Sequence, residues 1–234
     1  MVDKYLERQV GGRLVGPITA FHEYIFRDVL PAFNNIDGRA QQLAQDYYER
    51  ISCQPAGEYE ELDMADIAEA AQDQSMDWYD MMTSLRQTML NLLAAGLSHL
   101  VEQQLGMLSQ DASFSKTPLK TVRLEDVAGW YLAVLCIDLK ALNSWKKIDE
   151  LRLVANAVKH AEGAATNQLR LIRSELFTNP AYAHMFPELD RAIESASPVS
   201  APLSGEDFFV TLDVLREYSE SAEAFFREIA SCFR

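Results

Sequence analysis

The sequence has little positive charge. Its 234 residues hold 35 Asp and Glu against 21 Lys and Arg, so the formal net charge is −14 at pH 7. Wrapping a large nucleic-acid backbone requires a positive field over much of a protein surface. The composition excludes that mode of binding and confines any contact with a polyanion to a local patch.

Cysteine is scarce, and long hydrophobic runs are absent. Cys53, Cys136 and Cys232 are odd in number and form no C-x-x-C pair, which favours a reduced, cytoplasmic protein. Residues 1–14 contain no apolar core of the signal-peptide type, and the longest apolar stretch, 89–108, is interrupted by polar residues. We therefore expect neither secretion nor a membrane-spanning segment.

The familiar catalytic and cofactor motifs are also missing. The sequence contains no P-loop, no G-x-G-x-x-G, no H-E-x-x-H and no pair of E-x-x-H units. Of the four histidines, His22 lacks the second histidine of a zinc motif, and His184 lies in a loop-like context without an obvious partner. We expect no metal and no cofactor.

What the sequence does contain is helical periodicity along nearly its whole length, with no strand-period segment long enough for a sheet. The fold class predicted is all-α, a multi-helix bundle with long antiparallel helices and a C-terminal docking helix, in a single domain spanning 1–234. The helices expected before the C-terminal one are 17–51 with a break near Pro31, 64–108, 124–136, one from about 144 to Gly163, and 167–176.

The long helix predicted over 64–108 carries large or apolar residues at alternating spacings of four and three. This spacing is typical of the seam along which two near-antiparallel helices pack. The next position of the seam is His99, and a place on an apolar stripe favours a packed, hydrogen-bonded histidine over a ligand or a base. The seam residues are Trp78, Met82, Leu85, Met89, Leu92 and Gly96.

Residues 195–205, rich in Pro, Ser and Ala, have the composition of an exposed and flexible linker. The segment that follows, 206–233, places apolar residues near helical spacing. It is predicted to be the helix that docks on the bundle.

A polar stripe marks the helix predicted to start near Ser144. At about 100° per residue, five polar residues fall within a quarter to a third of the helical wheel. The segment from Leu139 to Arg173 around it holds seven Lys and Arg against three acids, a local net charge of +4. The stripe residues are Asp149, Arg152, Asn156, Lys159 and His160.

The string 155–160, ANAVKH, resembles the motif of the helical HEPN domains, which include many prokaryotic RNases and toxins. In that family an arginine, usually a polar residue next to it, and a histidine four to six positions beyond the arginine form a site for RNA. Asn156 and His160 match the motif, whereas Ala155 replaces its arginine.

The resemblance implies binding of RNA or a nucleotide, or a metal-independent ribonuclease, in a prokaryotic defence or toxin-antitoxin setting, with a homodimer completing the site. The catalytic residues would then be His160 as general base, Arg152 or Lys159 as phosphate clamp and Asn156 as the group that orients them. Lys147 and Lys159 would be ligand-binding cations.

Two other interpretations remain open. Cations in the last turn of a helix are favoured by its negative end, and a glycine commonly supplies the left-handed cap, so helix termination at Gly163 accounts for Lys159 and His160 by itself. The alternative function is a non-catalytic helical interaction module whose acidic surface contacts a basic protein partner and whose polar stripe is a buried hydrogen-bond network.

Overall fold

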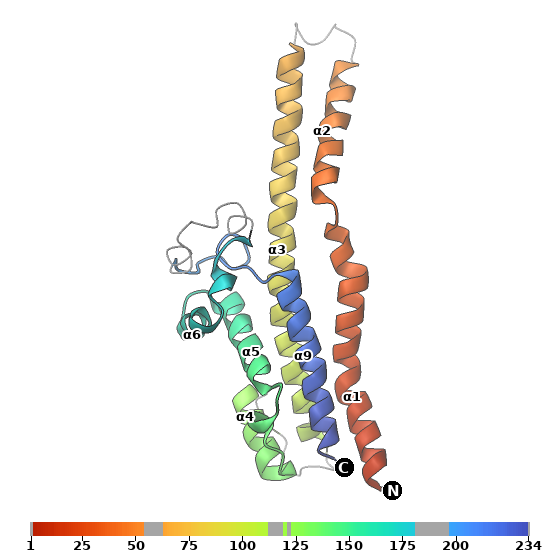
Figure 1. Ribbon diagram of the computed structural model, residues 1–234, viewed down its shortest axis with the longest axis vertical. Helices are drawn as coiled ribbons and strands as arrows, with labels where there is room; N and C mark the ends of the chain where they lie inside the picture. Colours follow the sequence, from red (N-terminus) through yellow and green to blue (C-terminus); the bar gives the residue numbers. More distant parts are fainter. Residues whose placement is uncertain (1, 54–62, 112–118, 121–122, 181–196, 234) are drawn as a thin grey trace.

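The computed structural model describes residues 2–53, 63–111, 119–120, 123–180 and 197–233, and within them every regular element is helical. The predicted all-α fold is confirmed. Helix α3, Met64–Gln110, runs along most of the length of the molecule (Figure 1). It begins after Asp63, whose carboxylate accepts a hydrogen bond from the amide of Ala65 at 3.3 Å.

Helix α1, Val2–Tyr24, continues through a π-helical turn, Ile25–Val29, and a 3-10 turn, Leu30–Phe33, into α2, Ile36–Ser52. The expected break near Pro31 is confirmed, and Asn35 closes it in a left-handed conformation with φ 59°. The expected start at Pro17 is wrong, because α1 passes through that proline. Its neighbours Leu14 and Ile18 are fully buried, and this packing holds the helix together.

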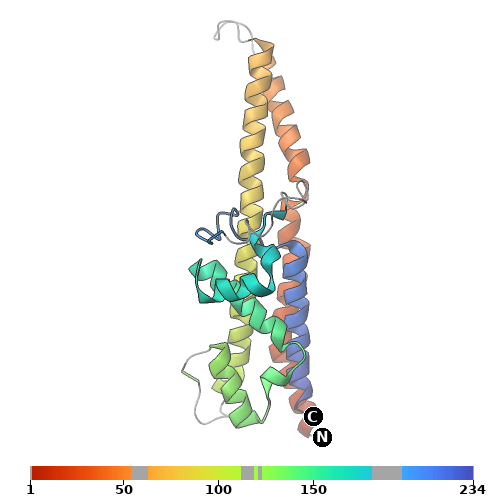
Figure 2. The same ribbon diagram turned by 60° about the vertical axis from the view of Figure 1, so that its left-hand side comes forward.

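The lower part of the molecule is a bundle, which we call the body. It contains α1, residues 81–110 of α3 (its lower half), α4 (Leu124–Trp130), α5 (Trp145–His160), α6 (Ala164–Ile172) and α9 (Leu212–Ser231). Helix α9 packs against α1, α3 and α5, and α5 also packs against α3 and α6 (Figures 1 and 2). One apolar core joins these helices.

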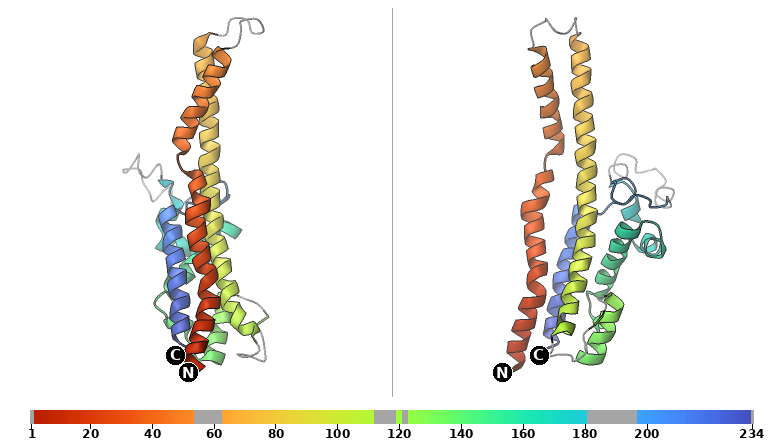
Figure 3. Two further views of the ribbon diagram at one scale, coloured as in Figure 1. Left: turned by 90° about the vertical axis from the view of Figure 1, so that its right-hand side faces the viewer. Right: turned by 180° about the vertical axis from the view of Figure 1, so that it is seen from behind.

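Helix α2 and residues 64–80 of α3 extend beyond the body as an antiparallel pair, which we call the arm (Figures 1 and 3). The arm buries only small or branched residues, with Ile36 and Ala40 of α2 meeting the side of α3 that carries Ile67 and Ala71. Ser75 is buried between the two helices and donates a hydrogen bond to the carbonyl of Ala40 at 2.9 Å.

The predicted seam of α3 is not the side that the body buries. Leu85 and Leu92 are each 45% exposed, and the side chain of His99 is 59% exposed beside Gln103. The buried side of the lower half is about half a turn away. It contains Leu90, Ala94, Leu97, Val101, Leu105 and Leu108. The spacing predicted a helix correctly but not which face the other helices cover.

Residues 197–211, which we call the strap, cross from α6 to α9 beside α3 (Figure 2). The sequence predicts an exposed linker here, but Val199 and Pro202 are buried. The expected exposure is therefore wrong at these residues, while the flexibility stays a prediction. The C-terminal helix begins at Leu212 instead of 206, because the hydroxyl of Thr211 caps it by accepting from the amide of Val214.

Candidate functional site

Helix α5 presents the polar stripe on one side while its other sides are packed. Its buried residues are Trp145, Ile148, Leu151, Leu153, Val154, Ala155, Ala157 and Val158. Arg152, Asn156, Lys159 and His160 follow one another at intervals of four, three and one, and therefore share one face of the helix. Lys159 and His160 are exposed, and Asn156 and Arg152 are partly buried.

Arg152 is paired within its own helix. Its Nε donates to Oδ1 of Asp149 at 2.8 Å, and its Nη2 lies 2.7 Å from the same oxygen. The two side chains are 28% and 31% exposed, so this ion pair is at the surface. The charge of Arg152 is largely balanced before any ligand arrives.

Unlike Arg152, the other three residues of this face have no partner among the described residues for their side chains: Asn156, Lys159 and His160. Within the described part of the chain, none of the three forms a hydrogen bond or an ion pair through its side chain. An amide, an ammonium and an imidazole thus lie free along the last turn and a half of α5. These groups are suited to donating hydrogen bonds to an anion.

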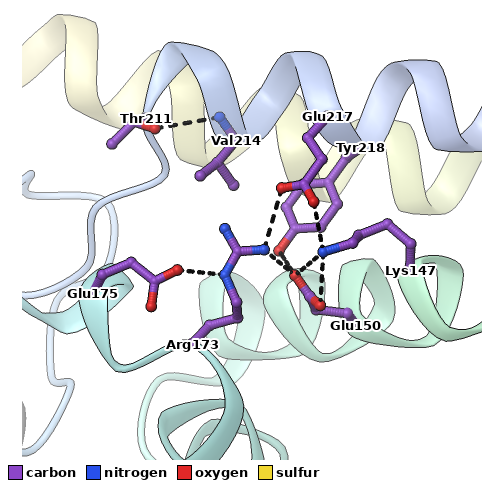
Figure 4. Close-up of polar contacts among 8 residues, drawn as sticks. All are labelled: Lys147, Glu150, Arg173, Glu175, Thr211, Val214, Glu217 and Tyr218. Carbon is purple, nitrogen blue, oxygen red and sulfur yellow. Dashed lines mark hydrogen bonds and ion pairs between the residues drawn. The ribbon is translucent and has the colours of Figure 1, made fainter.

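Lys147 lies on a different side of α5 and is already engaged. Its ammonium is 3.0 Å from Oε2 of Glu150 and 2.8 Å from Oε1 of Glu217 (Figure 4). Arg173 bonds the same two glutamates and also Glu175. The structure therefore does not bring Lys147 together with the other predicted site residues.

The cluster around Lys147 joins α5 to α9, because Tyr218 of α9 donates its hydroxyl to Oε1 of Glu150 at 2.8 Å. Burial and the charge of Glu150 raise the pKa of Tyr218 well above its usual value. Burial alone would raise the pKa of Glu217, but the hydrogen bonds and charges of Lys147 and Arg173 together outweigh it, so the net shift is downward. The cluster is a set of satisfied contacts between helices (Figure 4).

Helix α5 ends at His160, three residues before the predicted end at Gly163. The residue after it, Ala161, has φ 59° and ψ −133°, whereas Gly163 has φ 171°, which is ordinary extended backbone. The left-handed cap expected of Gly163 is therefore not formed; the helix ends instead on an alanine with positive φ. A positive φ is strained for a residue with a Cβ, and the strained residue, Ala161, comes directly after His160 in the chain.

Ala155, which stands at the position of the motif's arginine, is 2% exposed. An arginine there would place a charged group among the buried residues of α5. Packing thus explains the alanine.

Asn91 is a polar residue that the sequence did not single out. It is fully buried in α3 and binds the strap at three points: its Nδ2 donates to the carbonyls of Pro202 and Phe208, and its Oδ1 accepts from the amide of Val210. These partners in the strap are more than 100 residues away in the chain, so no local pattern indicates the role.

The described residues contain no group of three or more His, Cys, Asp or Glu placed to hold a metal ion. Among these residues there is also no helix with the length and apolarity required to cross a membrane. Cys53, Cys136 and Cys232 are exposed and free.

Comparison of the chain with protein-family models, curated proteins and solved structures found no match.

Proposed function

We propose that this protein binds RNA or a nucleotide at the C-terminal end of α5, through Asn156, Lys159 and His160. One contrast supports the proposal. In the basic segment 139–173, the charges of Lys147, Arg152, Arg170 and Arg173 are paired with carboxylates, as is that of Lys140. The polar groups at the end of α5 have no such partner in the described chain, and the one other unpaired cation of the segment there, Lys146, lies at the opposite end of the helix.

The chemistry of these groups suits a phosphate. Lys159 supplies a positive charge on a long, exposed side chain, His160 supplies a ring nitrogen that can donate, and Asn156 offers an amide donor from a partly buried position. A small site of this kind is compatible with a protein of net charge −14, since the contact is local.

Binding is better supported than cleavage. Arg152 lies eight residues before His160, which is about 12 Å along a helix axis, and its guanidinium is held by Asp149. A clamp and a base acting on one phosphate need to approach the same atoms, within about 3 Å. If the protein cuts RNA, His160 is the general base, and a second subunit supplies what Arg152 does not.

The setting follows from the HEPN resemblance and remains part of the proposal: a homodimer in prokaryotic defence or a toxin-antitoxin pair. Three free and exposed cysteines favour the reducing environment of the cytoplasm.

The test is a binding and cleavage assay with end-labelled single-stranded RNA in the presence of a chelator. The proposal expects His160→Ala to weaken binding, and Arg152→Ala to weaken it less. His99→Ala is the matched control, because His99 is an exposed histidine on another helix, α3. Equal binding by wild type, His160→Ala and His99→Ala, or no binding by any of them, contradicts the proposal.

A second candidate function is a helical interaction module that binds a basic protein through the arm. Five acidic residues of α3 are exposed along the arm and form no ion pair in the described chain: Asp66, Glu69, Asp73, Asp77 and Asp80. From residue 51 to residue 85 the sequence has no Lys or Arg. At about 100° per residue these acids point away from the side that contacts α2.

This candidate is tested by titrating the protein with a helical peptide that carries lysines at i, i+4 spacing. The double variant Asp73→Asn, Asp77→Asn is expected to bind the peptide more weakly, while Glu220→Gln on α9 is expected to behave as wild type. Loss of affinity of the same size in both proteins reflects net charge alone and rejects the arm as the binding surface.

A further inference from the structure

The turn that follows His160 is held in its strained conformation by contacts from three directions. The amide of Ala161 donates to the carbonyl of Ala157 at 2.9 Å, and the hydroxyl of Thr166 donates to the carbonyl of Ala161. The amide of Glu162 donates to the carbonyl of Val199 in the strap, also at 2.9 Å. The turn is therefore bonded to α5, to α6 and to the strap.

The side chain of Glu162 forms a second hydrogen bond with Val199. Its Oε2 accepts from the amide of Val199 at 2.8 Å, so Glu162 and Val199 are joined by two hydrogen bonds in opposite directions. The hydrogen bond from Arg170 lowers the pKa of this carboxyl, and the bond from Val199 acts in the same direction. Glu162 is charged at neutral pH and fixes the turn to the strap.

Arg170 of α6 holds Glu162 at two points. Its Nη1 donates to Oε1 at 3.1 Å, and its Nη2 donates to Oε2 at 3.0 Å. The same guanidinium donates to Oδ1 of Asn167 and to the carbonyl of Ser197, and it lies 4.6 Å from the centre of the ring of Phe177. With 17% of its side chain exposed, Arg170 is fixed by partners on α6, the strap and the turn.

Resting on the proposed function, we propose that Arg170 is a positioning residue of the site at the end of α5. Acting through Glu162, it keeps Ala161 in its positive-φ conformation and so fixes the direction in which Lys159 and His160 leave the helix. If the segment 161–162 relaxed, the C-terminal end of α5 would fray. The side chains of Lys159 and His160 have no contact of their own in the described chain that would then hold them in place. A prearranged pair binds a phosphate with less loss of entropy than a mobile pair.

The test follows His160 in the free protein by its imidazole ¹H–¹³C signal, assigned by its absence in His160→Ala. Arg170→Ala is expected to shift this signal and to leave those of His22 and His99 in place. Arg170→Lys, which cannot make the two-point contact, is expected to shift it in the same direction. Arg227→Ala is the matched control, because it breaks an ion pair with Glu223 on α9, away from the turn.

Affinity for single-stranded RNA is measured on the same proteins. Arg170→Ala is expected to weaken binding at least about threefold, whereas Ala161→Gly, which takes the positive φ without strain, is expected to bind as wild type and to recover affinity when it is combined with Arg170→Ala. An Arg170→Ala protein that binds RNA as well as wild type, or a loss in Arg170→Ala that Ala161→Gly does not reduce, overturns the proposal.

The two proposals fail in different ways. A His160 signal that does not move in Arg170→Ala and Arg170→Lys, both folded, rejects the positioning role whatever the protein binds. If the signal moves as expected but the wild type binds no RNA, the turn does position His160, and the proposed function is the part that fails.

Discussion

At the scale of single residues, the stability of the body depends on polar groups whose partners are far away in sequence. Asn91 is the clearest example, because one buried amide satisfies three backbone groups of the strap. Backbone groups of a buried segment need such partners, since each unpaired one loses its hydrogen bonds to water without replacement.

We expect Asn91→Ala to lower the free energy of unfolding by about 2–4 kcal/mol, because it leaves two carbonyls and one amide of the strap unpaired. Urea denaturation measures the loss. Gln42→Ala, which removes an exposed hydrogen bond to Asp46, serves as the control and is expected to change the free energy by less than about 0.5 kcal/mol. Losses of similar size in both variants would contradict the role of Asn91.

The strain at Ala161 gives a prediction of opposite sign. Ala161→Gly is expected to raise the free energy of unfolding by about 1 kcal/mol, because glycine adopts a positive φ without steric cost. The control is Ala224→Gly at an exposed position of α9, where glycine is expected to destabilise the helix by about 0.5–1 kcal/mol. Destabilisation by both changes would show that Ala161 is not strained.

At the scale of elements, α5 is joined to α9 by the cluster of Lys147, Glu150, Arg173 and Glu217 (Figure 4). The pKa of Glu217 is lowered from its usual 4.5, so its ionised form is favoured by folding. Stability from such a group is fully present above the unfolded pKa and is lost as the pH falls through the folded pKa.

We therefore expect the difference in unfolding free energy between wild type and Glu217→Gln to be constant above about pH 4.5 and to shrink below it. Denaturation at a series of pH values measures this difference. Glu220→Gln removes an exposed glutamate of the same helix that has no ion pair in the described chain, and its effect is expected to be small at every pH. If the Glu217→Gln difference does not change with pH, Glu217 does not stabilise the contact as an ion.

The spacing of apolar residues predicted the positions of the helices well, but it predicted the buried face only where a helix has a single apolar face. The apolar spacing of α9 and the long helical tract of α3 were both recognised from the sequence, although a break near residues 72–75 of α3 that the sequence suggested is not present. The seam through Leu85 and Leu92 was not buried, because several faces of a long helix have acceptable spacing and the other helices decide which one is covered.

The candidate site was predicted in part. Helical spacing correctly places Asn156, Lys159 and His160 on one face, since that depends on α5 alone. It could not show that Glu217 engages Lys147, nor that Arg170 holds the turn after His160. Those contacts join residues from different elements, and a single sequence holds no local signal for them.

At the scale of the whole molecule, the charges are unevenly distributed. The acids on α3 of the arm follow one another at i, i+3 and i, i+4 spacing, as Asp73, Asp77 and Asp80 show. Like charges at this spacing repel each other and destabilise a helix. The arm is therefore the part of the chain whose stability is expected to depend most on salt.

The double variant Asp73→Asn, Asp77→Asn is expected to slow hydrogen exchange of the arm amides, because each removed repulsion stabilises the helix by about 0.2–0.5 kcal/mol. Added salt is expected to slow exchange in the wild type and to have less effect in the variant. Glu223→Gln, which removes an attraction to Arg227, is expected to speed exchange in α9. Faster exchange in the arm of the double variant would contradict this account.

The central claim, that an anion is bound at the end of α5, is tested most directly by comparing two lysines of one helix. Lys159 and Lys146 are both exposed, neither has an ion pair in the described chain, and they are about 20 Å apart along the axis. The measurement is RNA affinity at several salt concentrations. We predict that Lys159→Ala weakens binding and lowers the slope of log affinity against log salt by about 0.7–1, while Lys146→Ala changes neither. Equal effects of the two substitutions, or no effect of Lys159→Ala, would contradict the claim.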